Sequence, residues 1–427
     1  MHPIAILSII VLAVLVVFLP RKYAMVPLML AASYLNASAG LQIGPAHLPP
    51  FRLLVILSLL RETIRGQIEI KWNGLDRVFI LYSATLAIAC SLRLMSFEGV
   101  NWVTGLTLDV TGGYLIARIC MPKWDDVIFF VKCYAILMIP FAFEMTIEQL
   151  AHYNLFNFVG APVTSYVREG RYRAYGTFGP ILSGTFGAIG AILSIPLWMW
   201  AANSRKRYAF GIFSGMVITV AGATSGAVMT LFYGLVALGC WYIRGRMRFV
   251  RIGIVLLIAA LALFMKAPVW YLIARISDVL GGTGWHRSFL IDQAIRYFRD
   301  WWMLGITHTG YWMPYQLSDG NSDITNQFLQ QGVTGGIVPM VLYVIIIVMA
   351  FRYIGIGLKN SANLAFKEQF MIWGLGCALF GHTATFFNVS YYNNVRIFFS
   401  FLLAAIALLR FPLSVPDWEP EEVQASS

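Results

Sequence analysis

Three arginines within six positions stand out in a chain that carries few charges. Arg168, Arg171 and Arg173 precede Gly176 and Gly179. A guanidinium group is a planar fork of donors that matches phosphate oxygens bidentately, so this segment suits a diphosphate. The two glycines would let backbone approach such a ligand, and the N-terminus of the following helix would add a favourable dipole. Anchoring of Arg and Tyr at a membrane interface is the alternative explanation.

A second basic segment runs from Trp285 to Trp302 and alternates apolar and charged residues at helical spacing. This pattern predicts an amphipathic helix that lies on a membrane surface. Asp292 and Arg296 stand four apart and can pair with each other. Arg287 has no such partner in the sequence. We therefore predict that Arg287 is a second phosphate contact, with a plain surface position as the alternative.

Three residues in the polar stretch that follows could accept a proton. His308 is flanked by glycine and threonine, and Asp319 and Asp323 lie in a run rich in Asp, Asn, Ser and Gly. Histidine, or a carboxylate with a raised pKa, can take the proton of an attacking hydroxyl. The alternatives are a solvated histidine and aspartates that form turns or cap helices.

The composition places these residues in a membrane protein. Of 427 residues, 59% are hydrophobic and 12% are charged, whereas soluble domains carry about a quarter charged residues. The net charge of +11 lies mostly in short loops, which favours membrane topology over nucleic-acid binding. The five cysteines lack paired ligand spacing, so we expect neither disulfides nor a metal site.

The apolar runs predict an all-α fold, a polytopic membrane helix bundle of about 12–13 transmembrane helices in one domain over residues 1–412. Residues 148–179 and 268–335 are two long external loops, and 413–427 is a disordered cytoplasmic tail. The first run is expected to be a retained helix, and the short third one could be re-entrant. The thirteen predicted spans are 4–19, 24–39, 50–61, 78–93, 103–119, 127–147, 180–202, 208–223, 226–243, 252–267, 336–357, 369–388 and 395–411.

Every second connection is basic, which orients the bundle with its N-terminus outside. The two long external loops break this rule because they also carry arginines, so a role other than topology is indicated; headgroup anchoring is the alternative. Arg93, Lys132, Glu144 and Arg396 lie near predicted helix ends and are expected to snorkel. No chain of acids crosses the midplane, which counts against ion-coupled transport.

Four short stretches resemble a known family, the bacterial O-antigen ligase and O-antigen or exopolysaccharide polymerase superfamily of membrane glycosyltransferases. Arg171 to Pro180 is similar to its Arg-x-x-Gly-Thr-Phe-x-x-Pro segment before a central span. The segment Thr224 to Ala227 resembles its Ser-Arg-Gly turn, without the arginine.

The other two stretches lie in the second long loop. Arg287 to Gly305 is similar to the family's pattern of Arg, an aromatic residue and Pro-x-x-Gly, with Trp302 where proline is usual. Asn326 to Gly336 resembles the His-Asn-x-x-Leu motif and its trailing glycines, with Thr325 where the histidine stands. Asp323 and His308 are therefore the substitutes to consider for the usual base.

The resemblance implies an inverting glycosyltransferase of a bacterial inner membrane, with its catalytic loops on the periplasmic or external face. The donor would be an undecaprenyl-diphosphate-linked oligosaccharide and the acceptor a glycan or lipid. Neither a metal nor another cofactor is implied, and membrane lipids and other polysaccharide-assembly proteins are the expected partners. We expect a polymerase of repeat units. The alternatives are a ligase that transfers finished glycan to lipid A core or protein, and a lipid-glycan flippase or solute permease.

Overall fold

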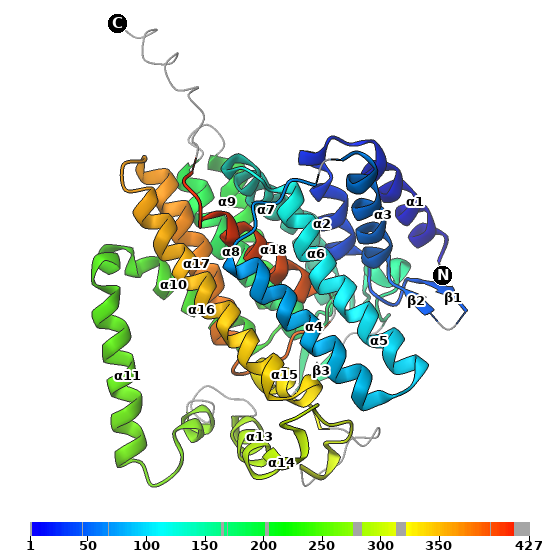
Figure 1. Ribbon diagram of the computed structural model, residues 1–427. Coiled ribbons are helices and arrows are strands. Elements are labelled where there is room, and N and C mark those ends of the chain that lie inside the picture. The colour runs from blue at the N-terminus through cyan, green and yellow to red at the C-terminus, as the bar shows by residue number, and fades with distance from the viewer. Residues whose placement is uncertain are drawn as a thin grey trace, which may run out of the picture.

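The computed structural model describes residues 2–44, 46–66, 68–163, 166–168, 170–200, 205–275, 284–312, 322–392 and 394–413. This part of the chain is a helix bundle (Figure 1). Its strands form two short antiparallel hairpins, β1 (Leu41–Ile43) with β2 (Ala46–Leu48), and β3 (Tyr166–Arg168) with β4 (Arg171–Arg173). The predicted helical bundle is confirmed. The predicted tail, apart from Leu413, and Asp319 lie outside the described residues.

Each of the thirteen apolar segments contains a helix. The segment predicted at 103–119 is divided, because a π-helix, η2 (Leu108–Gly112), separates α5 from α6. The helices of these segments are α1 (Pro3–Phe18), α2 (Met25–Tyr34), α3 (Pro50–Ile64), α4 (Gly74–Leu94), α5 (Phe97–Thr107), α6 (Gly113–Cys120), α7 (Trp124–Ala151), α8 (Pro180–Trp200), α9 (Arg205–Ala221), α10 (Ser225–Gly239), α11 (Met247–Phe264), α16 (Ile337–Asn360), α17 (Phe366–Thr385) and α18 (Val395–Leu408).

Length and composition are sufficient for membrane crossing in five helical stretches of the described chain. These are Gly74–Leu94, Trp124–Ala151, Pro180–Trp200, Ser225–Phe264 and Ile337–Asn360. The apolar helices α1 and α18 are shorter. The remaining helices of the thirteen segments are shorter or more polar than a single span requires.

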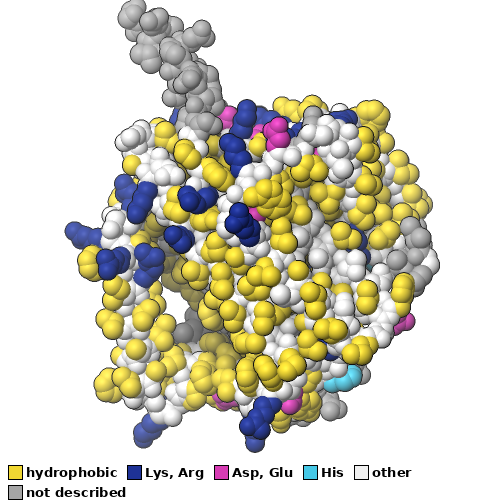
Figure 2. Space-filling model, viewed as in Figure 1, with side chains coloured by type: hydrophobic (Ala, Val, Ile, Leu, Met, Phe, Trp, Pro, Cys, Tyr) yellow, Lys and Arg dark blue, Asp and Glu magenta, His cyan; other side chains and the backbone are white. Residues whose placement is uncertain are grey.

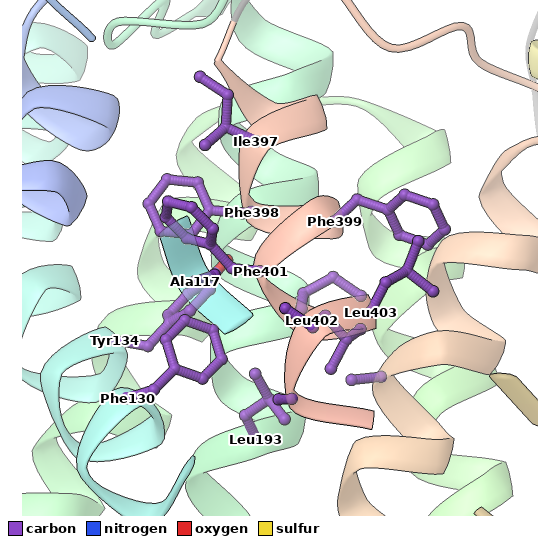
Figure 3. Close-up of a cluster of buried hydrophobic side chains, with 14 of the residues drawn as sticks. Ala117, Phe130, Tyr134, Leu193, Ile397, Phe398, Phe399, Phe401, Leu402 and Leu403 are labelled. Carbon is purple, nitrogen blue, oxygen red and sulfur yellow. The ribbon is translucent and has the colours of Figure 1, made fainter. Parts of the chain in front are cut away.

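The centre of the bundle is formed by α8 and α18. Helix α8 packs closely on α9 because glycines face each other there, and a Cβ at Gly187 would lie 2.7 Å from the carbonyl oxygen of Gly215. In α18, every residue except Arg396 is buried. Phe398 and Phe401 reach the rings of Phe130 and Tyr134 on α7 (Figure 3). Small residues and interlocking rings thus hold the central helices together.

Buried ion pairs lie near helix ends on the side that carries the basic connections. Arg118 of α6 donates from Nε to Asp76 of α4 at 2.9 Å, and Tyr114 donates to the same carboxylate. Arg61 pairs with Glu62. These two arginines are therefore neutralised inside the protein, and their positive charge does not reach the loops as the sequence suggested. Exposed arginines, such as Arg205 and Arg248, remain at this end, which we call the basic end.

Figure 2 shows the Lys and Arg side chains of one face gathered mainly over the basic end. The opposite end, which we call the loop end, carries α13 (Gly284–Arg296), α14 (Phe298–Trp301) and the short helix η7 (Gly310–Trp312) (Figure 1). Helix α11 stands apart from the bundle and contains no buried residue. Its side chains therefore face surroundings outside this chain.

Candidate functional site

The hairpin β3–β4 carries the three clustered arginines on one face. Arg168 and Arg171 are cross-strand partners, and Arg173 follows Arg171 by two positions. Partners across a hairpin and residues two apart along a strand point to the same side. Tyr172 points to the other side, where its ring stacks on His152 at 4.0 Å between centroids. The hairpin thus presents a cationic face at the loop end.

The glycines that follow the hairpin have a structural role. The amides of Tyr175 and Gly176 donate to the two carboxylate oxygens of the fully buried Glu148, at 2.8 and 2.9 Å. Gly176 needs its φ of +59°, and an added Cβ would lie 2.8 Å from the hydroxyl of Ser183. The Gly179 amide donates to the carbonyl oxygen of Tyr175. The Gly176 amide is therefore not available to a ligand, contrary to the prediction, because a carboxylate of the protein already binds it.

Arg287 lies in the first turn of α13, which a preceding 3-10 helix, η6 (Val269–Tyr271), holds in place. Asp292 accepts hydrogen bonds from the side chains of Trp270 and Tyr271. The predicted pairing of Asp292 with Arg296 is therefore wrong, because the Asp292 carboxylate is hydrogen-bonded to side chains of η6 and Arg296 is exposed. Helix α13 also has its own small core, in which Leu290 and Ala294 cluster with Trp301, Trp312, Ile324 and Val333.

Four residues from separate segments converge beside the hairpin: Arg168, Arg287, Asp323 and Tyr392, which we call the external cluster. Burial and the charge of Arg168 lower the pKa of Arg287, whereas the charge of Asp323 opposes this shift. Partial burial, then the charge of Asp323, raise the pKa of Tyr392 to about 12, and the two side chains share a hydrogen bond. The ring Nε2 of His286 lies 3.3 Å from the carbonyl oxygen of Asp323.

The electrostatics of this cluster favour an anionic ligand. The charges of Arg168 and of Asp323 both act on the Arg287 guanidinium, in opposite directions. The Nε of Arg287 is buried without a hydrogen-bond partner in the described part of the chain. Because a buried donor without a partner costs free energy, an anion that accepts from the Arg287 Nε would remove this cost.

A cleft of about 390 Å³ extends from Tyr392 toward the end of α4. Its lining includes Thr307, Thr309 and the guanidinium of Arg93, whose Nη1 donates to the carbonyl oxygens of Ile306 and Val333 at 3.1 and 2.9 Å. We expected Arg93 to snorkel to the surface. Instead it ties α4 to the loop end and adds positive charge to the outer cleft.

A second cavity, of about 140 Å³, continues inward from the outer cleft. The two share Trp102, Gln330, Thr334 and Tyr392. Arg396, also expected to snorkel, instead lines this inner cavity and contacts Asp109 of η2 at 3.4 Å. The two cavities are therefore adjacent, and Tyr392 of the external cluster lines both.

The motif Asn326 to Gly336 forms a short helix, α15 (Gln327–Gly335), beside both cavities. Asn326 caps this helix, since its side-chain oxygen accepts from the amides of Phe328 and Leu329 at 3.0 and 3.1 Å. Thr325 precedes the cap, and its hydroxyl is buried without a hydrogen-bond partner in the described part of the chain. This motif therefore positions the wall of the cleft.

Of the other predicted site residues, Arg171 and Arg173 share the hairpin face of Arg168, and Asp319 lies outside the described chain. His308 is exposed and does not line the cleft, although its neighbours Thr307 and Thr309 do. Arg171 is exposed near the turn of its hairpin, and Arg173 is partly buried. The described residues hold no group of three or more His, Cys, Asp or Glu side chains that suits a metal ion.

Sequence reasoning missed Tyr392 and His286 as members of this region. His286 directly precedes Arg287, so its proximity was available from the sequence once α13 was predicted. Tyr392 lies between α17 and α18, 69 positions beyond Asp323 by their numbers, and no local pattern marks it. No known family model matches the chain, and no curated protein matches it either.

Proposed function

We propose that this chain is a membrane glycosyltransferase that extends a polysaccharide by joining lipid-diphosphate-linked repeat units on the external face of a bacterial inner membrane. One observation carries this proposal: the charges of Arg168 and Asp323, from two other segments, both act on Arg287. The residues on either side of Asp323, Ser322 and Ile324, line the outer cleft. The family resemblance of four motifs supports it. In this proposal the thirteen helical segments cross or enter the bilayer, with the basic end in the cytoplasm.

The external cluster suits the chemistry of such a transfer. The acceptor hydroxyl oxygen attacks the anomeric carbon, and its proton passes to the Asp323 carboxylate. The bond from the anomeric carbon to the diphosphate oxygen breaks, and the lipid diphosphate leaves with the electron pair. Attack from the opposite face inverts the anomeric centre. Arg168 and Arg287 stabilise the charge that develops on the leaving group. Tyr392 holds the Asp323 carboxylate through a hydrogen bond.

The test replaces one arginine of the cluster and one outside it. Arg287→Ala is expected to abolish long polymer and to leave single repeat units on the carrier lipid, because loss of one such donor slows the transfer by about 10²–10³-fold. Arg296→Ala is the matched control, since Arg296 lies on the same helix but is exposed. The control should leave polymer length unchanged.

Glycan profiles and protein abundance are measured together in cells that carry either variant. Normal polymer with the Arg287→Ala protein present in the membrane would contradict the proposal. Full-length polymer stranded on the carrier lipid would indicate a ligase instead. An unchanged glycan profile after deletion of the whole chain would point to transport without covalent chemistry.

A further inference from the structure

The inner cavity lies between α4, η2, α15, α16 and α18, beneath the outer cleft. It is lined by Tyr82 and Ser83 of α4, Thr107 and Thr111 on either side of Asp109, and Arg396 of α18. Arg396 is the one residue of α18 that is not buried, with 28% of its side chain accessible. A cation in the first turn of an otherwise buried helix thus faces this internal space.

The charges around the cavity do not balance. Arg52 donates to both oxygens of Asp109, at 2.9 and 2.8 Å, while Arg396 reaches the same carboxylate at 3.4 Å. Two guanidinium groups therefore share one carboxylate. The Nε of Arg396 is also buried without a hydrogen-bond partner in the described chain. Because charge is screened weakly away from water, the excess positive charge favours an anion in the cavity.

The π-helix η2 positions Asp109 and part of the cavity wall. η2 interrupts α5 and α6 with five residues, Leu108–Gly112, and carries Asp109. Such interruptions are uncommon and often occur at functional sites. Thr107, directly before it, lines the cavity with a hydroxyl that is buried and has no hydrogen-bond partner in the described residues. This hydroxyl and the Arg396 Nε are two polar groups that a ligand would satisfy.

The rest of the lining suits a sugar ring. Tyr82, Tyr343 and Tyr391 line the space with aromatic rings, and Gln327, Gln330 and Gln331 contribute amide groups. Sugar rings have apolar faces that pack on aromatic rings, and hydroxyl edges that hydrogen-bond with amides. A largely apolar pocket with a few placed polar groups is the usual form of a small-molecule site.

We propose that the inner cavity binds one sugar unit that carries an anionic substituent, a carboxylate or a phosphate ester, and that Arg396 pairs with this substituent. The inference rests on the proposed function, since the sugar would belong to the glycan that the external cluster elongates. The outer cleft connects the two places through Trp102, Gln330, Thr334 and Tyr392. Arg396 would then select glycans by the charge of one unit.

Binding is measured on the purified full-length protein in lipid nanodiscs, with glucuronate, glucose 6-phosphate and glucose as probes. Both anionic sugars, or one of them, should bind the unmodified protein more tightly than glucose does, and the comparison identifies the substituent. Arg396→Gln should weaken binding of the anionic sugar by at least about tenfold, as expected for loss of a charge-assisted contact. Arg396→Lys should retain part of the preference.

Arg410→Gln is the matched control, because Arg410 is exposed just after the end of α18. Arg396→Gln should still fold, since Asp109 keeps both hydrogen bonds from Arg52. If it does not fold, Thr107→Val tests the same cavity: the Thr107 hydroxyl makes no hydrogen bond in the described chain, and its loss should weaken binding of every sugar probe.

Equal binding of glucose and the anionic sugars, or unchanged binding by Arg396→Gln, would overturn the inference. These results do not depend on polymer formation. Anion-selective binding in a chain whose Arg287→Ala variant still makes normal polymer would support the cavity and overturn the proposed function. Loss of polymer in Arg287→Ala, together with equal binding of anionic and neutral sugars by the unmodified protein, would support the proposed function and overturn the inference about the cavity.

Discussion

Arg287 shows how one residue is prepared for an anion. Its guanidinium is partly buried in the first turn of α13, and the nearby charge of Arg168 lowers its pKa further. The charge of Asp323 offsets only part of this lowering of the Arg287 pKa. In the proposed function, the diphosphate of the donor would add negative charge beside the Arg287 guanidinium, which favours its charged form.

Asp323 is the residue whose chemistry is most directly testable. Asp323→Asn keeps the shape of the side chain but cannot accept the proton, so we expect chain elongation to fall by about 10²–10⁴-fold, the usual range for general-base catalysis. Elongation is measured with membranes and purified lipid-linked repeat units. His308→Asn is the comparison, because His308 is exposed and outside the cleft. Equal losses in both variants would contradict the assignment.

Tyr392 gives a prediction about pH. Its pKa is raised to about 12, so the folded state holds the phenol proton more tightly than the unfolded state does. Any stabilisation from this proton is fully present below the ordinary pKa of 10.0 and is lost as pH rises through 12.

The phenol should therefore donate to Asp323 at every pH between neutral and 10. Tyr392→Phe is expected to lower the elongation rate by the same factor across that range. The measurement is the ratio of the two elongation rates as a function of pH. A ratio that approaches one well below pH 10 would show that the phenol ionises earlier.

At the scale of elements, glycines decide how the loop end joins the bundle. Gly305 has a φ of +81°, and a Cβ there would lie 2.4 Å from the carbonyl oxygen of Val333 and 2.7 Å from Nη1 of Arg93. The amide of Ile306 donates to the same Val333 oxygen at 2.8 Å. This contact sets the position of the outer cleft relative to α4.

Gly305→Ala should destabilise the protein by about 1–3 kcal/mol, because the backbone is strained and the loop must move away from Val333. Gly253→Ala is the control: Gly253 lies within α11 and has open space around it, so the change should be neutral or stabilise by about 0.5–1 kcal/mol. Thermal unfolding in nanodiscs measures both. A Gly305→Ala protein as stable as the parent would show that the loop adapts freely.

The ion pair between α4 and α6 gives a second prediction at this scale. Asp76→Asn leaves Arg118 buried with its charge uncompensated, so we expect a loss of about 3–5 kcal/mol. The buried Cys90 and Cys120 supply the readout, since their thiols react with a maleimide only when the bundle opens. Glu69→Gln removes an exposed carboxylate just before α4 and should change nothing. Equal thiol reactivity in the two variants would contradict the prediction.

At the scale of the molecule, the two ends of the bundle differ in charge and in content. Exposed basic residues gather at one end, whereas α13 and the strand β3 lie at the other (Figures 1 and 2). Helix α11 buries none of its residues against the bundle. An apolar helix in that position is stable only if lipid or another chain surrounds it.

The orientation is tested with single cysteines in intact cells, after replacement of the five native cysteines. A membrane-impermeant maleimide should label His308→Cys in intact cells, and Lys359→Cys only after the membrane is opened, because we place the loop end outside. Both positions are exposed, so differences in burial do not complicate the comparison. If only Lys359→Cys is labelled in intact cells, the basic end lies outside and the assigned orientation is wrong.

The sequence by itself determined the helical class of the protein and the position of its helices. Hydrophobic runs are local, so each of the thirteen segments could be recognised without knowledge of its neighbours. The arginines of the external cluster were also visible, because Arg168 and Arg287 stand in basic loops where topology did not explain them.

Only the tertiary structure decided which side chains meet. Arg396 contacts Asp109 across 287 positions of sequence, and Gly176 binds Glu148 where a ligand was expected. Asp292 bonds to Trp270 and Tyr271 in preference to its helical neighbour. Helix positions follow from local hydrophobicity, but these contacts depend on how distant helices and loops pack, because a polar group excluded from water takes whichever partner that packing brings within reach.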